Sequence, residues 1–404
     1  MAKVLFVNVP AQGHANPTFP LVSSFVKAGH TVDYLLTEEF RKKVEYSGAT
    51  LIPYRPSNSI DAVLNGKINI FSAFKFVREI LQMINNKTKE IASEYDVIIV
   101  GGMFPLIAKM EKKLSTPVIY CSAVFLQNEQ SVQHIFKKTW DAPALIEFVM
   151  THIKLRKWLS RQILPRLFGF PMDDVLVLFG QKPSKLNIVL TSRYFQPEQE
   201  TFDETCLFIG PTPTVPSKDD TFPISQLETC NKPIIYATLG TVFNKWIDFF
   251  KNVILAFKNT NYLVVMSTGN KKTLELLGPV PENFIVRDFV PQSEVLKYAD
   301  LCIAHGGMSS ISDGISLGVP MLLVPLGADQ FINAYRLQEL GAGKVLTKKD
   351  ATAENLKREA TLVLGDKTLK AEVKKIQESF ITAGGPSRAV EEVERLLAKT
   401  TKSV

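Results

Sequence analysis

The sequence alternates short apolar runs with helix-like segments, and this alternation constrains the fold more than any other feature. Residues 4–9 and 31–36 are mostly apolar and read as buried strands, and each is followed by a helical pattern. The alternation restarts in the second half, where residues 233–238 and 262–266 read as strands. Strands that alternate with helices form parallel sheets with right-handed crossovers. We therefore predict an α/β protein with two doubly wound domains in tandem.

A proline-rich segment separates the two series of strands and helices. Residues 208–216 contain three prolines and one glycine, a composition typical of linkers between domains. We expect a first domain over residues 1–210, a linker over 211–222 and a second domain over 223–385. Residues 386–404 show an amphipathic helical pattern, and this C-terminal helix can return to pack on either domain, the N-terminal one included.

The composition is that of an ordinary globular protein. Of the 404 residues, 46% are hydrophobic and 22% charged, with no uncharged apolar run of about 18 residues that would suggest a membrane span. The apolar run at residues 4–7 is too short for a signal peptide, and the four cysteines show no C-x-x-C pairing. We expect reduced thiols, a cytoplasmic location and no stable membrane insertion. The net charge of +7 forms no basic patch with interleaved aromatics, which argues against nucleic acid as a partner.

One strand end in the second half carries residue types that suit phosphate binding. Residues 301–304 read as a buried strand, and His305, Gly306 and Gly307 follow it before a helical pattern begins. Glycines let a ligand approach the backbone closely, and a helix N-terminus offers free N–H groups and a positive dipole. His305 and Ser310 can add side-chain hydrogen bonds. The segment fits a pyrophosphate cradle, although a tight turn with a structural histidine fits it as well.

Further candidate residues follow the neighbouring strands, at the sheet edge where open α/β sheets bind ligands. Thr241 lies in a second glycine-bearing turn, and Asp313 lies where a carboxylate can accept hydrogen bonds from ribose hydroxyls. Asp329 and Gln330 offer an acceptor and an amide to sugar hydroxyls, and Phe289 can stack on a flat base. Taken singly, each of these residues is also compatible with a structural role.

The first half offers a candidate base. His14 follows the first strand, and an imidazole titrates near neutral pH, so it suits removal of a proton from an acceptor hydroxyl. A lone loop histidine can also be structural. The first strand is not followed by G-x-G-x-x-G, and neither a P-loop lysine motif nor a D-x-D sequence occurs. We therefore expect no dinucleotide cofactor and no metal.

Together these residues resemble the family 1 glycosyltransferases of GT-B fold, in particular the bacterial branch of bacilli and streptomycetes that modifies macrolides and flavonoids. The resemblance runs the full length, through residues 10–17 (Pro-Ala-Gln-Gly-His-Ala-Asn-Pro), the junction at 208–211 and the region from Phe289 to Asn333. It implies two Rossmann-like domains that face a central cleft, a UDP-sugar as donor substrate and no cofactor.

The resemblance also implies roles for individual residues, with His14 as the catalytic base. The residues that it assigns to the donor are Thr241, Phe289, Val290, Gln292, His305, Gly307, Ser309, Ser310, Asp313, Asp329 and Gln330. Three of them depart from the family pattern. Phe289 replaces a tryptophan that stacks on uracil, Asp313 replaces a glutamate that binds the ribose, and Ser309 replaces a common asparagine beside the diphosphate.

One further departure concerns the base itself. In the family an aspartate normally ends the strand that corresponds to residues 97–100, where it orients the catalytic histidine as the aspartate of a serine-protease triad does. This chain has Gly101 at that position. The sequence leaves three explanations open: a weaker base, a substitute carboxylate such as Glu129, and an acceptor that is already acidic.

The function that the resemblance implies is inverting, metal-independent transfer of a hexose, commonly glucose, from a UDP-sugar to a small acceptor. A hydrophobic or phenolic acceptor such as a flavonoid or macrolide is expected, with residues 61–181 shaping its pocket. One alternative is an epimerase of the same architecture. Another is a UDP-sugar-binding protein with weak or no transferase activity, because Gly101 replaces the aspartate that pairs with the catalytic histidine. We expect a monomer or a weak dimer.

Overall fold

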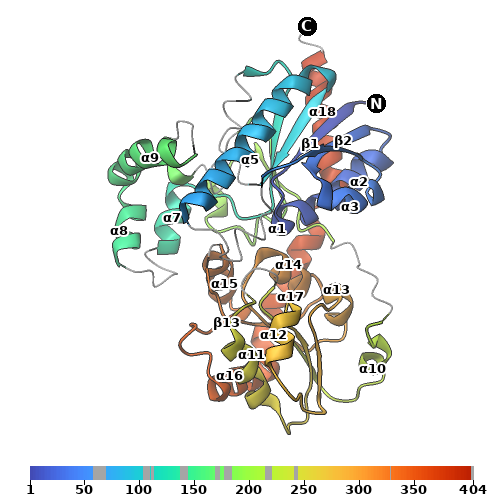
Figure 1. The fold of residues 1–404 in the computed structure, drawn as a ribbon, viewed down its shortest axis with the longest axis vertical. Helices are drawn as coiled ribbons and strands as arrows, with labels where there is room; N and C mark the ends of the chain where they lie inside the picture. Colours follow the sequence, from blue (N-terminus) through green and yellow to red (C-terminus); the bar gives the residue numbers. More distant parts are fainter. Residues whose placement is uncertain are drawn as a thin grey trace. The chain divides into compact units, whose positions relative to one another are not determined.

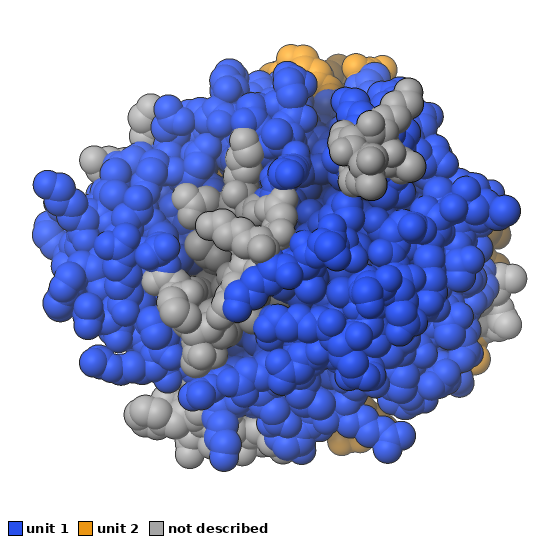
Figure 2. Space-filling model, turned by 90° about the horizontal axis from the view of Figure 1, so that it is seen from above, with its two compact units in different colours: residues 1–215, 379–404 blue, residues 216–378 orange. Residues whose placement is uncertain are grey.

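The computed structural model divides the chain into two compact units. Unit 1 consists of Met1–Val215 and Ser379–Val404, and unit 2 of Pro216–Glu378 (Figure 2). The residues that the structure describes are 1–57, 70–102, 110, 113–136, 144–168, 173–176, 184–213, 221–240, 244–327 and 329–401. The C-terminal segment therefore joins unit 1 from Ser379, earlier in the chain than the boundary expected at residue 386.

Unit 1 is built on a parallel sheet whose strand order is β3-β2-β1-β4-β5-β6-β7. Its strands are β1 (Lys3–Val7), β2 (Thr31–Thr37), β3 (Thr50–Tyr54), β4 (Val97–Gly101), β5 (Val118–Ser122), β6 (Asn187–Val189) and β7 (Cys206–Phe208). The chain winds outward from β1 in one direction and then from β4 in the other. The carboxyl ends of β1 and β4 therefore border the topological switch point, where doubly wound sheets bind ligands.

Helices cover both faces of this sheet, because successive residues of a buried strand point to opposite sides. Val4 and Phe6 of β1 belong to one hydrophobic cluster, and Leu5 and Val7 belong to the other. The first cluster includes residues of α2 (Phe19–Lys27), α3 (Arg41–Tyr46) and α18 (Gly385–Thr401), and the second includes residues of α5 (Ile70–Ile91) (Figure 1). Among the described residues, unit 1 also contains the α-helices α1 (Gln12–Ala15), α7 (Glu129–His134), α8 (Ala144–Thr151) and α9 (Ile153–Phe168).

The C-terminal helix α18 is part of the unit 1 core. Its residues Ala389, Val390 and Val393 lie in the same cluster as Val22 and Phe25 of α2. On the helix, positions 389, 390 and 393 share one face because they are one, three or four residues apart. This apolar stripe accounts for the return of the chain to unit 1.

Unit 2 repeats the arrangement with the strand order β10-β9-β8-β11-β12-β13, again with parallel pairs. Its strands are β8 (Ile234–Thr238), β9 (Leu263–Ser267), β10 (Phe284–Arg287), β11 (Leu301–Ala304), β12 (Met321–Leu323) and β13 (Gly343–Val345). Its helices are α10 (Ile224–Glu228), α11 (Ile247–Phe257), α12 (Lys271–Leu276), α13 (Gln292–Val295), α14 (Met308–Ser316), α15 (Gln330–Glu339), α16 (Ala353–Gly365) and most of α17 (Lys367–Thr382). The switch point lies between β8 and β11, which are fully buried.

The predicted fold class, two doubly wound α/β domains, is confirmed. None of the helices in the described parts of the chain combines the length and the apolar character needed to cross a membrane.

Val393 tests whether α18 is an integral part of unit 1. Its side chain is 1% exposed, so Val393→Asp would bury a charge without a partner. We expect the free energy of unfolding of unit 1 to fall by about 3 kcal/mol, measured by urea denaturation. Glu391→Ala, on the exposed side of the same helix, is the control and should unfold like the wild type. An unchanged midpoint for Val393→Asp would contradict the packing of α18.

Candidate functional site

Three of the residues predicted to bind the diphosphate, His305, Gly307 and Ser310, lie at the switch point of unit 2. β11 ends at Ala304, His305 and Gly306 follow, and Gly307, whose backbone is extended, occupies the N-cap position of α14. No side chain caps this helix. The first N–H groups of α14 are therefore available at the edge where β8 and β11 end side by side.

Two glycine backbones enclose the imidazole of His305. A Cβ atom on Gly240 would lie 2.8 Å from His305 Cε1, and one on Gly307 would lie 2.7 Å from His305 Nε2. Gly240 also has a φ of 68°, a conformation that disfavours a side chain. The turn after β8 and the start of α14 thus accept the ring only because both positions lack side chains.

His305 is a neutral side chain at physiological pH. Burial of the imidazole lowers its pKa to about 4, since desolvation disfavours the charged form. Part of the residue is exposed at the sheet edge, but Nδ1 is buried and has no hydrogen-bond partner among the described residues. A neutral imidazole offers one N–H donor and one acceptor to a ligand.

Gln292 joins two of the predicted nucleotide contacts. Its Nε2 donates to Asp313 Oδ2 at 2.7 Å, and its Oε1 accepts from Ser310 Oγ at 3.5 Å. The hydroxyl of Tyr236, in the middle of β8, lies 3.5 Å from the same Oε1. Burial raises the pKa of Tyr236 well above its ordinary value, so this phenol keeps its proton. The structure brings Gln292, Ser310 and Asp313 together.

Phe289 and Val290 differ sharply in exposure. Phe289 is 55% exposed after the end of β10, so a flat group can cover its ring. Val290 is 3% exposed and packs in the core, so only its backbone is suited to contact a base. Ser309 is half-buried in the first turn of α14. Thr241 lies outside the described residues.

The predicted sugar-binding pair lies at the start of α15. Asp329 Oδ2 accepts a hydrogen bond of 2.8 Å from Asn333 Nδ2, which also donates to the Gly306 carbonyl at 3.1 Å. Gln330 Oε1 accepts from the backbone N–H groups of Leu326 and Gly327 at 2.9 and 3.2 Å. The start of α15 is thereby tied both to its own loop and to the cradle.

Two residues of this site, Tyr236 and Asn333, were not predicted. Asn333 stands four residues after Asp329 on one helix face, a spacing at which the two side chains meet, and this spacing was a usable signal. Tyr236 gave no signal, because an aromatic residue in a buried strand is most simply a core residue.

His14 lies at the corresponding place in unit 1. It stands on α1, directly after β1, and its Cβ is 3.8 Å from the position that a Cβ on Gly102 would take. Gly102 follows the end of β4 with a φ of 80°. His14 therefore borders the switch point of unit 1, next to the strand end where the family carries an aspartate.

The side-chain amide of Asn8 lies beside the end of β4, next to Gly101. A Cβ on Gly101 would lie 2.6 Å from Asn8 Nδ2. Glu129, the suggested substitute carboxylate, begins α7, and its Oε1 accepts a hydrogen bond from Arg156. Arg156 also donates to both carboxylate oxygens of buried Asp174 at 2.9 Å. The charge of Glu129 is thus balanced by a buried guanidinium.

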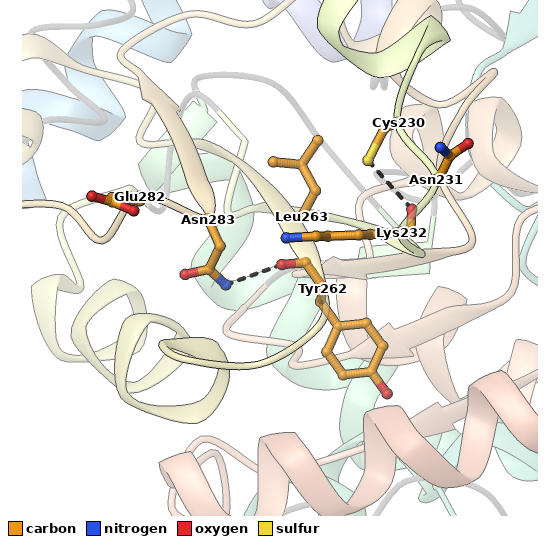
Figure 3. Close-up of a pocket in the computed structure, with 7 residues that line it drawn as sticks. All are labelled: Cys230, Asn231, Lys232, Tyr262, Leu263, Glu282 and Asn283. Atoms are coloured by element: carbon orange, nitrogen blue, oxygen red, sulfur yellow. Dashed lines mark hydrogen bonds between the residues drawn. The ribbon is translucent and has the colours of Figure 1, made fainter.

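A cavity of about 350 Å³ lies at the opposite edge of the unit 2 sheet (Figure 3). Lys232, Tyr262 and Asn283 line it, and they precede β8, β9 and β10. The Nδ2 of Asn283 donates to the Tyr262 carbonyl at 3.0 Å. None of the predicted site residues lines this cavity, and ligands of doubly wound sheets bind at the carboxyl edge.

Comparison with known proteins gives a consistent result. The model of the erythromycin biosynthesis protein CIII-like C-terminal domain matches residues 258–396. The chain is 33% identical to YdhE of Bacillus subtilis, an uncharacterised UDP-glucosyltransferase, over 100% of both chains. It is 31% identical to the NDP-glycosyltransferase YjiC of the same species over 98% of both chains. The crystal structure of the calicheamicin glycosyltransferase CalG4 superposes with a TM-score of 0.74 at 25% identity, covering 98% of each chain.

The chain belongs to the family 1 GT-B UDP-glycosyltransferases. The predicted GT-B fold and the predicted membership of this family are confirmed. This glycosyltransferase is an enzyme that transfers a sugar from a nucleotide-sugar donor.

The described residues of this glycosyltransferase contain no group of three His, Cys, Asp or Glu side chains that could hold a metal ion.

The buried state of His305 predicts a pH dependence of stability. Its folded pKa of about 4 lies below the ordinary value of 6.5, so the unfolded chain takes up this proton first as the pH falls. Between pH 7 and pH 5 the wild type should lose about 2 kcal/mol more unfolding free energy than His305→Gln. Urea denaturation at the two pH values measures the difference. Parallel losses in both proteins would show that His305 is not desolvated.

Proposed function

We propose that the protein catalyses inverting, metal-independent transfer of a hexose, glucose in particular, from a UDP-sugar to a hydroxyl of a small hydrophobic or phenolic acceptor. The observation that carries the proposal is the imidazole of His305, enclosed by Gly240 and Gly307 at the uncapped start of α14. Flavonoids and macrolides are the acceptor classes that we expect. The relative YdhE is named a UDP-glucosyltransferase, which supports a UDP-glucose donor for this chain.

In this proposal the unit 2 cradle stabilises the leaving diphosphate. Negative charge develops on UDP as the bond to the anomeric carbon breaks, and the N–H groups of α14 and the Ser310 hydroxyl meet it. Neutral His305 donates one N–H to the same oxygens without repelling other donors. Asp313, oriented by Gln292, binds ribose hydroxyls, and Asp329 binds the sugar.

On the acceptor side, His14 acts as the general base. It removes the proton from the acceptor hydroxyl while that oxygen attacks the anomeric carbon from the face opposite UDP. One carbon–oxygen bond forms, the bond to UDP breaks, and the proton stays on His14 until solvent takes it. Inversion at the anomeric carbon follows from this single displacement.

The chain lacks the aspartate that pairs with the catalytic histidine in the family, and this supports a second candidate function. With Gly101 at the end of β4, a UDP-sugar-binding protein with weak or no transferase activity is the second candidate function. A substitute carboxylate at Glu129 would have to leave Arg156. None of the four cysteines forms a disulfide, which fits a reducing compartment such as the cytoplasm. We propose a monomer or weak dimer.

The decisive test is a product assay on the wild type and His14→Ala. UDP release and the mass of the product are measured with UDP-glucose and UDP-N-acetylglucosamine against a panel of phenols and macrolides. We expect a glycosylated product, and a loss of about 10²- to 10⁴-fold in kcat for His14→Ala, since a positioned base contributes that much. UDP-sugar binding without product would favour the binding protein, and epimerised donor would favour an epimerase.

Phe289 provides a test of the donor site alone. Stacking on an aromatic ring contributes about 1 kcal/mol, so Phe289→Ala should weaken UDP binding by roughly 5- to 10-fold. Phe289→Trp, which restores a larger ring, should bind at least as tightly as the wild type. Calorimetric titration with UDP measures both variants. Unchanged affinity for Phe289→Ala would place the uracil elsewhere.

A further inference from the structure

A buried chain of hydrogen bonds links Asn8, Tyr34 and Thr18 in unit 1. The three residues are 1%, 0% and 1% exposed, respectively. Asn8 Nδ2 lies 3.2 Å from Tyr34 Oη, and Tyr34 Oη lies 2.6 Å from Thr18 Oγ1. Asn8 follows β1, Tyr34 lies in β2, and Thr18 ends the short helical segment after α1. The chain therefore spans both sides of the turn that carries His14.

The donors and acceptors of this chain can be assigned. Thr18 Oγ1 donates its one hydrogen to the Ala15 carbonyl at 2.7 Å, so Tyr34 must donate to Thr18. Burial raises the pKa of Tyr34 well above its ordinary value, which keeps that hydrogen in place. The Tyr34 oxygen then accepts from Asn8.

Asn8 uses its whole amide. One N–H of Nδ2 goes to Tyr34, the other goes to the His14 carbonyl at 3.1 Å, and Oδ1 accepts from the Val9 backbone N–H at 2.9 Å. A flipped amide would set its oxygen against the His14 carbonyl, so these partners decide the orientation. The carbonyls of His14 and Ala15 are thereby held by Asn8 and Thr18.

The two glycines at the end of β4 leave room for this amide. A Cβ on Gly101 would lie 2.6 Å from Asn8 Nδ2, and one on Gly102 would lie 2.9 Å from Asn8 Oδ1. Either side chain would push the amide away from its partners. Asn8 can therefore keep its hydrogen bonds only if residue 101 is a glycine.

We propose that Asn8 is a positioning residue for His14. From the space beside Gly101, the Asn8 amide donates to the backbone carbonyl of His14 and so holds the segment that carries the imidazole. The inference rests on the proposed role of His14 as the base. Loss of the bond would let the turn shift, and a displacement on the order of 1 Å can lower a rate by about 100-fold.

The test compares Asn8→Ala with Gly101→Ala. Asn8→Ala removes the hydrogen bond to the His14 carbonyl directly, and Gly101→Ala removes it because the added Cβ displaces the Asn8 amide. Each should lower kcat by about 10- to 100-fold, with the KM for the UDP-sugar changed by less than about twofold, because the donor residues lie in unit 2. The double variant should be no slower than Asn8→Ala, since both substitutions act through one bond.

Asn187→Ala is the matched control. Asn187 is a fully buried asparagine of unit 1 whose Nδ2 donates to the Ser184 carbonyl at 2.9 Å, away from β1. It should lose thermal stability comparable to Asn8→Ala and keep the wild-type kcat. Equal kcat for Asn8→Ala and Asn187→Ala, or additive effects of Asn8→Ala and Gly101→Ala, would overturn the inference.

His14→Ala separates this inference from the proposed function. If His14→Ala is inactive while Asn8→Ala is fully active, only the positioning role fails. If His14→Ala retains full transfer to neutral alcohols, the base assignment fails, and the positioning role fails with it.

Discussion

The parallel pairing of the first and fourth strands of each unit, β1 with β4 and β8 with β11, determines where this protein can do chemistry. At these pairs the sheet order reverses, so successive crossovers leave in opposite directions and the carboxyl ends of the strands stay uncovered by helices. His14 and His305 both lie at such ends. The other described candidate residues of unit 2 follow β10, β11 and β12.

In unit 2 the switch point is shaped by the absence of side chains as much as by their presence. The imidazole of His305 occupies space that Gly240 and Gly307 leave free, and its burial keeps it neutral. Asn333 then ties α15 to the Gly306 carbonyl. A neutral donor beside an uncapped helix suits a diphosphate, because the helix supplies the positive potential and the imidazole supplies a directed N–H.

Unit 1 has the same topology but a different proposed role, because its histidine, His14, is proposed to remove a proton from the acceptor. A buried polar chain costs free energy unless every member is satisfied, and Asn8, Tyr34 and Thr18 satisfy one another and two backbone carbonyls. Where the family has an aspartate, this chain has Gly101, and the hydrogen-bonded amide of Asn8 lies in the adjacent space. The two units differ in what they bury beside the histidine: glycine backbone in one, a hydrogen-bonded amide in the other.

The sequence by itself determined the fold class, the division into two α/β series and the strand ends that carry His14 and His305, because apolar periodicity and glycine placement are local properties of the chain. Through the family resemblance it also identified Gly101 as one of the departures from the family pattern. Only the tertiary structure decided that Asn8 fills the space beside Gly101, that Gln292 holds Asp313, and that α18 completes the core of unit 1 from the far end of the chain. These contacts join residues from different strands and helices, and their partners depend on strand order and on side-chain packing, which no local pattern specifies.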